Sequence, residues 1–275
     1  MRIIVGGCGS SGTTLIKNIL NEHPEIHCGE EASFFDRLDI LNEDLETISA
    51  LMQVDHYHAL DSRMIFPIIR PTTAGPRSQF GLCQARWEEL WPTTNRDKLI
   101  TEIDSGKYTN LSEVFHMLLA READANGKVY WAEKTPGNIF TMQNLINYYP
   151  DVKLIVCLRN PWDTIASLIF NRNFDVFSSI CRWTMSTIQA LSLANEPNIQ
   201  FINYDLLCSE ESDLVVKDLW EFLDVDPGSP TMHGAKLPTT AQKTWLAYKD
   251  RISPGMIESV DLATHDLWKS LTEVI

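Results

Sequence analysis

The chain has 275 residues, of which 44% are hydrophobic, and its formal net charge is −14 at pH 7. This length suffices for one sizeable core, and no Pro/Gly/Ser-rich linker or charge run divides the sequence, so we expect a single domain over residues 1–275. Because the excess negative charge repels polyanions, neither a nucleic acid nor an anionic membrane is an expected partner. Any anion that the protein binds has to be held by local groups.

The start of the chain and its cysteine usage predict a cytoplasmic protein. A strand-like segment begins at Arg2, which leaves no room for a signal peptide, and the longest apolar runs are far too short to cross a bilayer. The 6 cysteines are scattered without a C-x-x-C pair. This usage is typical of a reducing compartment.

Short apolar strands alternate with helical patterns along most of the chain. We predict one helix from the glycine-rich loop to His23, and a further helix begins at Pro161. The predicted strands are residues 2–5, 26–28, 129–132, 153–158 and 199–203, and the other helical patterns cover about 111–125, 138–148, 164–169, 178–194 and 214–222. This alternation predicts an α/β fold with a doubly wound, mostly parallel sheet and helices on both faces, whose ligands bind at the carboxyl ends of the strands.

Residues 55–104 interrupt this alternation. They carry several prolines, together with Trp87 and Trp91, among mixed polar residues. We interpret them as an irregular insertion that forms the acceptor-side wall of a binding site. A structural flap packed by the two tryptophans is an equally good interpretation.

The segment GGCGSSGTT, residues 6–14, lies between the first strand and the first helix. It fits the G-x-G-x-x-G pattern of dinucleotide-binding folds, with Glu30 and Glu31 at about the distance of the ribose-binding acid. It also fits the G-x-x-x-x-G spacing of NTP-hydrolysing P-loops, but Thr13-Thr14 replaces Lys-[Ser/Thr]. Both patterns place backbone N–H groups at a helix N-terminus, where they bind an anion. A tight turn without a ligand is the structural alternative.

A second anion site is predicted at the end of the strand over residues 153–158. An NTPase usually has an aspartate there to hold Mg²⁺, whereas this strand is followed by Arg159, beside the helix that Pro161 opens. A guanidinium group at this place can bind a phosphate. Two separated phosphate-sized sites indicate a nucleotide with phosphates at two places, and we expect no metal.

These motifs resemble the sulfotransferases that use 3′-phosphoadenosine 5′-phosphosulfate (PAPS). GSSGTTL (9–15) resembles their 5′-phosphosulfate loop, and RNPWDTIAS (159–167) resembles their 3′-phosphate motif. HPEIHCGEE (23–31) and EKTP (133–136) are similar to the tyrosylprotein sulfotransferase branch. The resemblance implies an α/β domain with a P-loop-like phosphosulfate loop. It implies transfer of a sulfuryl group from PAPS to a hydroxyl of a small molecule or peptide, with 3′,5′-ADP as the product.

The resemblance also assigns roles to matching residues. Glu31 would be the catalytic base, with Glu30 and His116 as alternatives, and Lys134 would stabilise the leaving oxygen. The residues expected to bind PAPS are Gly9, Ser10, Ser11, Gly12, Thr13, Thr14, Arg159, Ser167 and Tyr204. Each assignment has a structural alternative: a solvated acidic turn, a surface lysine, a packed helix residue, or a core aromatic ending a strand.

Two departures from the family pattern weigh on the prediction. Ser10 stands where the family commonly has arginine or lysine, so Lys134 has to supply more of the positive charge. Ser33 stands where the tyrosylprotein branch has an acceptor-reading arginine, which weakens the case for acidic peptides. A P-loop kinase or NTPase and a non-catalytic nucleotide-binding protein remain alternatives. The sequence does not determine the oligomeric state, and a homodimer is compatible with it.

Overall fold

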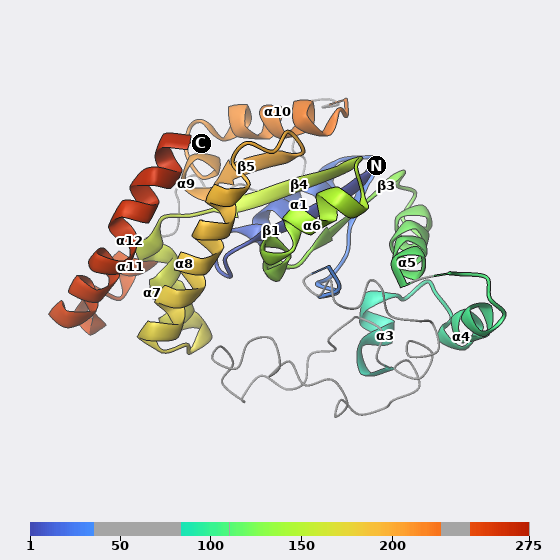
Figure 1. Cartoon of the computed structure of the whole chain (residues 1–275), viewed down its shortest axis with the longest axis horizontal. Helices are drawn as coiled ribbons and strands as arrows, with labels where there is room; N and C mark the ends of the chain where they lie inside the picture. Colours follow the sequence, from blue (N-terminus) through green and yellow to red (C-terminus); the bar gives the residue numbers. More distant parts are fainter. Residues whose placement is uncertain (36–83, 110, 227–242, 275) are drawn as a thin grey trace.

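The computed structural model describes residues 1–35, 84–109, 111–226 and 243–274. One sheet lies at its centre, and every strand pair in that sheet is parallel. Its 5 strands have the order β2-β3-β1-β4-β5: β1 (Arg2–Gly7), β2 (Ile26–Cys28), β3 (Tyr130–Lys134), β4 (Val152–Leu158) and β5 (Ile199–Asn203). All strands therefore end at the same edge of the sheet (Figure 1).

The strand register brings the predicted site segments together at this carboxyl edge. Val5 of β1 lies opposite Lys134 of β3, and Gly7 of β1 lies opposite Cys157 of β4. The next strand, β5, ends in register with β4, because Leu158 pairs with Asn203.

Helices cover both faces of the sheet, because its central strands are apolar on both sides. Ile3 and Val5 point to one face and pack with α1 (Thr13–Glu22) and α10 (Ser212–Leu223). Ile4 points to the other face, where the core includes residues of α5 (Leu111–Ala125), η3 (Pro136–Phe140) and α6 (Met142–Tyr148). The predicted doubly wound α/β fold is confirmed.

A third apolar cluster lies beyond the carboxyl edge and joins Cys8 of the glycine-rich loop to several helices. Its members come mainly from α7 (Pro161–Arg172), α8 (Val176–Ser192) and α12 (Pro254–Val274). In Figure 1 these helices group on one side of the sheet with the short α11 (Thr244–Ala247), whereas α5 lies on the other side. The remaining short elements here are α9 (Tyr204–Leu207) and η4 (Lys249–Arg251).

The predicted segments match the observed elements, with bounds that differ by a few residues, and two differences are notable. β3 continues to Lys134, so the lysine lies within the strand and not after it. The predicted helix over residues 138–148 is divided into the 3-10 turn η3 and α6 at Thr141, which ends η3 and also precedes α6.

The described part of the predicted insertion is helical and not irregular. It forms α3 (Gln84–Leu90) and α4 (Arg96–Asp104). Trp87 and Trp91 are buried in the same apolar core as Phe34 and Phe115, so they pack this segment onto the domain. Residues 55–83 lie outside the described residues, and the role as an acceptor-side wall stays a prediction.

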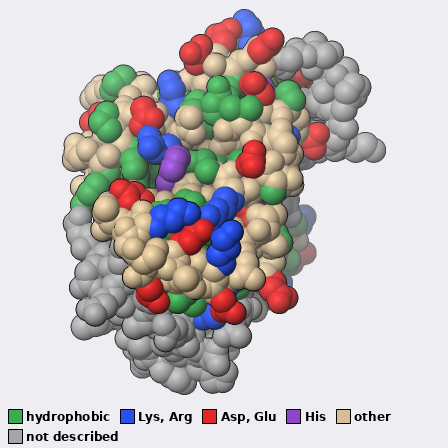
Figure 2. All heavy atoms as spheres, turned by 90° about the vertical axis from the view of Figure 1, so that its right-hand side faces the viewer, with side chains coloured by type: hydrophobic (Ala, Val, Ile, Leu, Met, Phe, Trp, Pro, Cys, Tyr) green, Lys and Arg blue, Asp and Glu red, His purple; other side chains and the backbone are tan. Residues whose placement is uncertain are grey.

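The face that carries α4 and α5 mixes basic and acidic side chains (Figure 2). Among the described helices, none is long and apolar enough to cross a bilayer.

The cysteines that the structure describes are all free. Cys181 is partly exposed, and the other four are buried, as expected for small apolar residues: Cys8, Cys28, Cys157 and Cys208.

Candidate active site

The glycine-rich loop joins the end of β1 to the start of α1 and needs its glycines for steric reasons. Gly7 has φ +147°, and a Cβ there would collide with the carbonyl of Cys157 in β4. Gly12, with φ +103°, precedes α1 and supplies no side-chain cap for its first N–H groups. Because the first N–H groups of an α-helix have no intrahelical partner, this end of α1 offers donors and a partial positive charge to an anion.

Arg159 lies directly beside this loop, although it is far away in the sequence. Its side chain is buried, and its Nη1 donates a hydrogen bond of 2.9 Å to the carbonyl of Ser10. The guanidinium group also lies over the ring of Tyr204, 4.6 Å from the ring centroid. That ring packs against Gly12 so closely that a Cβ at Gly12 would collide with it. The two predicted anion-binding elements are therefore in direct contact, closer than the separated sites expected from the sequence.

Thr244, which the sequence analysis did not single out, completes the surroundings of Arg159. Its hydroxyl oxygen accepts a 3.4 Å hydrogen bond from Arg159 Nη2, and the residue is fully buried. Its chain neighbours hold it in place: Lys243 forms an ion pair with Asp205 at 3.5 Å, and the N–H of Trp245 donates to Asp163 at 2.9 Å. Sequence pattern alone carries no signal for this contact, because α11 has only 4 residues.

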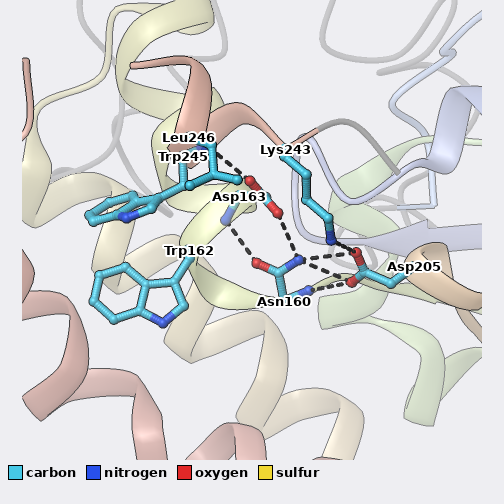
Figure 3. A pocket seen from close by; sticks show the side chains of 7 residues that line it. All are labelled: Asn160, Trp162, Asp163, Asp205, Lys243, Trp245 and Leu246. Atoms are coloured by element: carbon cyan, nitrogen blue, oxygen red, sulfur yellow. Dashed lines mark hydrogen bonds and ion pairs between the residues drawn. The ribbon is translucent and has the colours of Figure 1, made fainter. Parts of the chain in front are cut away.

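Asn160 links the two carboxylates of this network (Figure 3). Its side chain accepts from the N–H of Asp163, which caps α7, and its amide donates to Asp163 and to Asp205. The rings of Trp162 and Trp245 meet edge to face at 4.4 Å on the other side of the same open pocket. This pocket has a volume of about 530 Å³ and lies beside the Arg159 segment.

Ser167 lies on the second turn of α7. It is buried, and its hydroxyl accepts a hydrogen bond from Asn171 at 3.3 Å. The adjacent Leu168 is the nearest side chain to Gly9 of the loop. This part of α7 therefore lies beside the glycine-rich loop. The position is compatible both with binding of the nucleotide by Ser167 and with a packing role for it.

Glu31 and Lys134 form an ion pair at the carboxyl edge of the sheet. The lysine side chain is only 3% exposed, whereas that of Glu31 is 29% exposed. Glu30 points elsewhere, because it forms an ion pair with Lys17 on α1 and is half exposed. The structure thus separates the two glutamates that the sequence left as alternatives.

His116 lies toward the opposite edge of the sheet. It accepts a hydrogen bond of 3.2 Å from Trp131 Nε1, and Trp131 pairs in register with Arg2 at the start of β1. Three residues of strand, about 10 Å, separate that position from Lys134. Burial, and then the charges of Arg2 and the N-terminus, lower the pKa of His116. His116 is therefore an exposed residue of α5 that contacts Trp131 at a distance from Lys134, and this position does not favour it as the base.

Comparison with known proteins bears on the family and the fold of this chain. The sequence profile of the sulfotransferase family matches residues 2–195, which include the loop, Glu31, Lys134 and Arg159. No curated protein matches the chain.

Three solved structures share the fold at low sequence identity. The sulfotransferase domain of the Synechococcus PCC 7002 olefin synthase aligns over 99% of this chain and 93% of its own, with a TM-score of 0.57 and 14% identity. The sulfotransferase domain from the curacin biosynthetic pathway aligns over 95% of both chains, with a TM-score of 0.55 and 16% identity. A sulfotransferase from Alicyclobacillus acidocaldarius aligns over 99% of this chain and 94% of its own, with a TM-score of 0.51 and 14% identity.

The family profile spans more than half of the chain, and the solved structures share its sheet and surrounding helices. The chain therefore belongs to the sulfotransferase family.

Proposed function

We propose that this sulfotransferase moves a sulfuryl group from PAPS to a hydroxyl acceptor. The observation that carries the proposal is the 2.9 Å hydrogen bond from Arg159 to the carbonyl of Ser10. It joins a buried guanidinium group to the loop that leads into the N-terminus of α1, so that two anion-binding elements could serve one ligand. A nucleotide with separate 5′ and 3′ phosphates suits this pair.

The residues fit the donor in the following way. The N–H groups of Ser11 to Thr14, with the threonine hydroxyls, would hold the 5′-phosphosulfate, and Arg159 would hold the 3′-phosphate. Ser11 supports this, because its buried hydroxyl has no partner among the described residues. Thr244 contacts the arginine, Ser167 lies on α7 beside the loop, and Tyr204 contacts both Arg159 and Gly12, so each could contribute to binding of the donor.

Glu31 and Lys134 fit the chemistry of the transfer. The acceptor oxygen attacks sulfur in line while Glu31 takes its proton, and the bond between sulfur and the bridging oxygen breaks. The 5′-phosphate oxygen leaves with the electron pair, and Lys134 stabilises its charge in a nearly dry environment. The products are the sulfated acceptor and 3′,5′-ADP.

The acceptor is the open part of the proposal. The Gly29-Glu30-Glu31 run resembles the tyrosylprotein branch, but Ser33 replaces the arginine that reads acidic peptides. We therefore propose a hydroxyl compound as the acceptor class and include a tyrosine peptide among the candidates. A cytoplasmic location belongs to the same proposal.

The test is ligand stabilisation followed by transfer. We expect 3′,5′-ADP to raise the melting temperature, because a ligand that binds the folded state stabilises it, while ATP with Mg²⁺ and NADH do little. Incubation with PAPS and a mixture of phenols, sugars, alcohols and a tyrosine peptide should then give products heavier by one SO₃ group in mass spectrometry. Stabilisation by NADH, or Mg²⁺-dependent phosphate release from ATP, would favour the dinucleotide or NTPase alternative.

One observation keeps a non-catalytic nucleotide-binding protein as a second candidate. Ser10 provides no charge at the loop position where a basic residue is common, and Lys134 is the cation paired with the candidate base. Binding of 3′,5′-ADP without transfer to any acceptor would favour this candidate.

A further inference from the structure

Glu133 is a buried carboxylate on β3, adjacent in the sequence to Lys134 of the proposed catalytic pair. It is 1% exposed and precedes Lys134 on β3, so the two side chains point to opposite faces of the sheet. Its carboxylate accepts hydrogen bonds from polar groups of the surrounding segments. These partners determine what it does.

The carboxylate holds the chain segment that carries Glu31. Its Oε1 accepts a hydrogen bond of 3.2 Å from the N–H of Ala32 and one of 2.6 Å from the hydroxyl of Thr135. The oxygen of Thr135 in turn accepts from the N–H of Ser33 at 3.1 Å. Two successive N–H groups immediately after Glu31 are thus bound by one carboxylate and one hydroxyl.

The segment needs this restraint, because its backbone conformation is unfavourable. Ser33 has φ +53°, in the left-handed region that residues with a side chain rarely adopt. Such a conformation persists only where the surroundings fix it. The hydrogen bonds from Ala32 to Glu133 and from Ser33 to Thr135 hold the backbone in this conformation.

The same carboxylate reaches the strand that leads into the glycine-rich loop. Its Oε2 accepts a hydrogen bond of 2.6 Å from the side-chain amide of Asn138, which also donates to the carbonyl of Val5 at 3.0 Å. Val5 pairs in register with Lys134. One buried group therefore connects the Glu31 segment, the end of β3 and the end of β1.

All of these partners donate hydrogen bonds to Glu133, which suits the ionised form. The pKa of Glu133 is nevertheless raised, because burial outweighs the hydrogen bonds from Thr135, Asn138 and Ala32 and the charge of Lys134. A glutamine in its place would offer only one acceptor oxygen and would turn an NH₂ group toward a donor.

We propose that Glu133, acting with Thr135, is a positioning residue that sets the distance and direction between Glu31 and Lys134. The inference rests on the proposed function, because it assumes that this pair performs the transfer. This role does not require Glu133 to touch the donor or the acceptor. Its effect passes through the backbone at Ala32 and Ser33.

The test uses the threonine, because Thr135→Val is nearly isosteric and leaves the buried carboxyl group of Glu133 in place. We expect Thr135→Val to lower kcat by roughly 10- to 100-fold, as a small misplacement of reacting groups does, while the Kd for 3′,5′-ADP stays near the wild-type value. Thr135→Ser restores the hydroxyl and should recover the lost turnover. Thr264→Val, which removes another buried threonine hydroxyl on α12, is the matched control and should keep wild-type kcat.

A double-mutant cycle with Glu31→Gln separates positioning from general destabilisation. If Thr135 and Glu133 act through Glu31, then Thr135→Val causes little further loss of kcat in the Glu31→Gln protein. Full additivity of the two losses, or unchanged kcat in both Thr135→Val and Glu133→Gln, would overturn the inference.

Amide hydrogen exchange keeps the inference distinct from the proposed function. Exchange at Ala32 and Ser33 should accelerate in Thr135→Val but not in Thr264→Val, whether or not any acceptor is sulfated. Wild-type protein that sulfates no acceptor would contradict the proposed function, and unchanged exchange at these two amides would contradict the positioning role.

Discussion

The guanidinium group of Arg159 lies 4.6 Å from the centroid of the Tyr204 ring, and the same ring packs against Gly12 at the start of α1. The end of β4, the end of β5 and the glycine-rich loop therefore form one contact unit. A change in Arg159, Tyr204 or Gly12 should therefore alter the orientation of the N–H groups that the arginine and the loop offer to an anion.

Replacement of Arg159 by alanine should weaken binding of 3′,5′-ADP by about 1.5–3 kcal/mol, the usual contribution of a hydrogen bond to a charged group. The loss includes the contact with Ser10, which helps to hold the loop. Isothermal titration calorimetry measures the effect. Arg251→Ala is the matched control, because Arg251 also stacks on aromatic rings, those of Phe170 and Tyr248, and should leave the affinity unchanged. An unaltered Kd in Arg159→Ala would remove this arginine from the site.

The Gly12→Ala substitution tests the contact with Tyr204. The new Cβ would collide with the ring and would also strain a residue at φ +103°, so we expect loss of stability and of 3′,5′-ADP binding. Gly127→Ala is the control, because Gly127 has φ +68° but nothing within 4 Å of its Cβ position. It should cost about 1 kcal/mol through backbone strain alone. Thermal unfolding compares the two, and equal losses would mean that the Tyr204 contact is unimportant.

Much of this architecture is predictable from the sequence, because the signals are local. The strand–loop–helix at residues 2–22 follows from apolar spacing and glycines, and the parallel sheet follows from strand and helix alternation. The register that places Val5 beside Lys134 is a consequence of that topology. The proximity of Glu31 and Lys134 could therefore be predicted from the sequence.

The contacts that were missed depend on long-range packing. Thr244 meets Arg159 only because Lys243 and Trp245 are bound by Asp205 and Asp163 on other elements. Trp87 belongs to a short helix whose burial depends on residues far along the chain, and composition alone suggested irregular structure there.

One omission had a local signal. Helix α12, residues Pro254–Val274, was not predicted although Val260, Leu267 and Leu271 recur at helical spacing. Thr264 occupies the intervening position on the buried face, where its hydroxyl bonds the carbonyl of Val260 at 2.8 Å. A polar residue whose hydroxyl is satisfied within its own helix thus interrupted an apolar pattern without interrupting the helix.

Removal of the Lys134 charge should reduce turnover more than donor affinity. Lys134→Gln deletes the cation that would stabilise the leaving oxygen, so we expect kcat to fall by roughly 10²- to 10³-fold, as for loss of one oxyanion donor. Lys217→Gln removes a lysine from an exposed ion pair with Glu221 and is the control. Steady-state kinetics with PAPS measures both. A Lys134→Gln enzyme with normal kcat would require another source of positive charge.

Replacement of Glu31 by glutamine tests the base directly. We expect kcat to fall by roughly 10²- to 10⁴-fold with nucleotide affinity largely kept, since glutamine retains the shape but cannot accept the proton. Glu30→Gln is the matched control, because Glu30 is paired with Lys17 on α1 and should not take part in proton transfer. Greater loss of activity in Glu30→Gln than in Glu31→Gln would reverse the assignment.

Glu102 should make the stability of the fold depend on acid pH. It lies on α4 and accepts hydrogen bonds from Tyr108 at 2.8 Å and Arg121 at 3.0 Å, and it forms an ion pair with Lys107 at 3.1 Å. Burial alone would raise the pKa of Glu102, but the hydrogen bonds from Tyr108, Lys107 and Arg121 outweigh it and lower the pKa to about 2.

A carboxyl whose pKa is lower in the folded than in the unfolded protein stabilises the fold above its unfolded pKa, and this stabilisation disappears as the pH falls toward the folded pKa. Glu102→Gln should therefore be less stable than wild type at pH 7, and the difference should shrink between about pH 5 and pH 2. Urea unfolding at several pH values measures this. Glu258→Gln, on the exposed side of α12, is the control. A stability difference between Glu102→Gln and wild type that stays constant from pH 7 to pH 3 would mean that the loss comes from packing and not from the charge of Glu102.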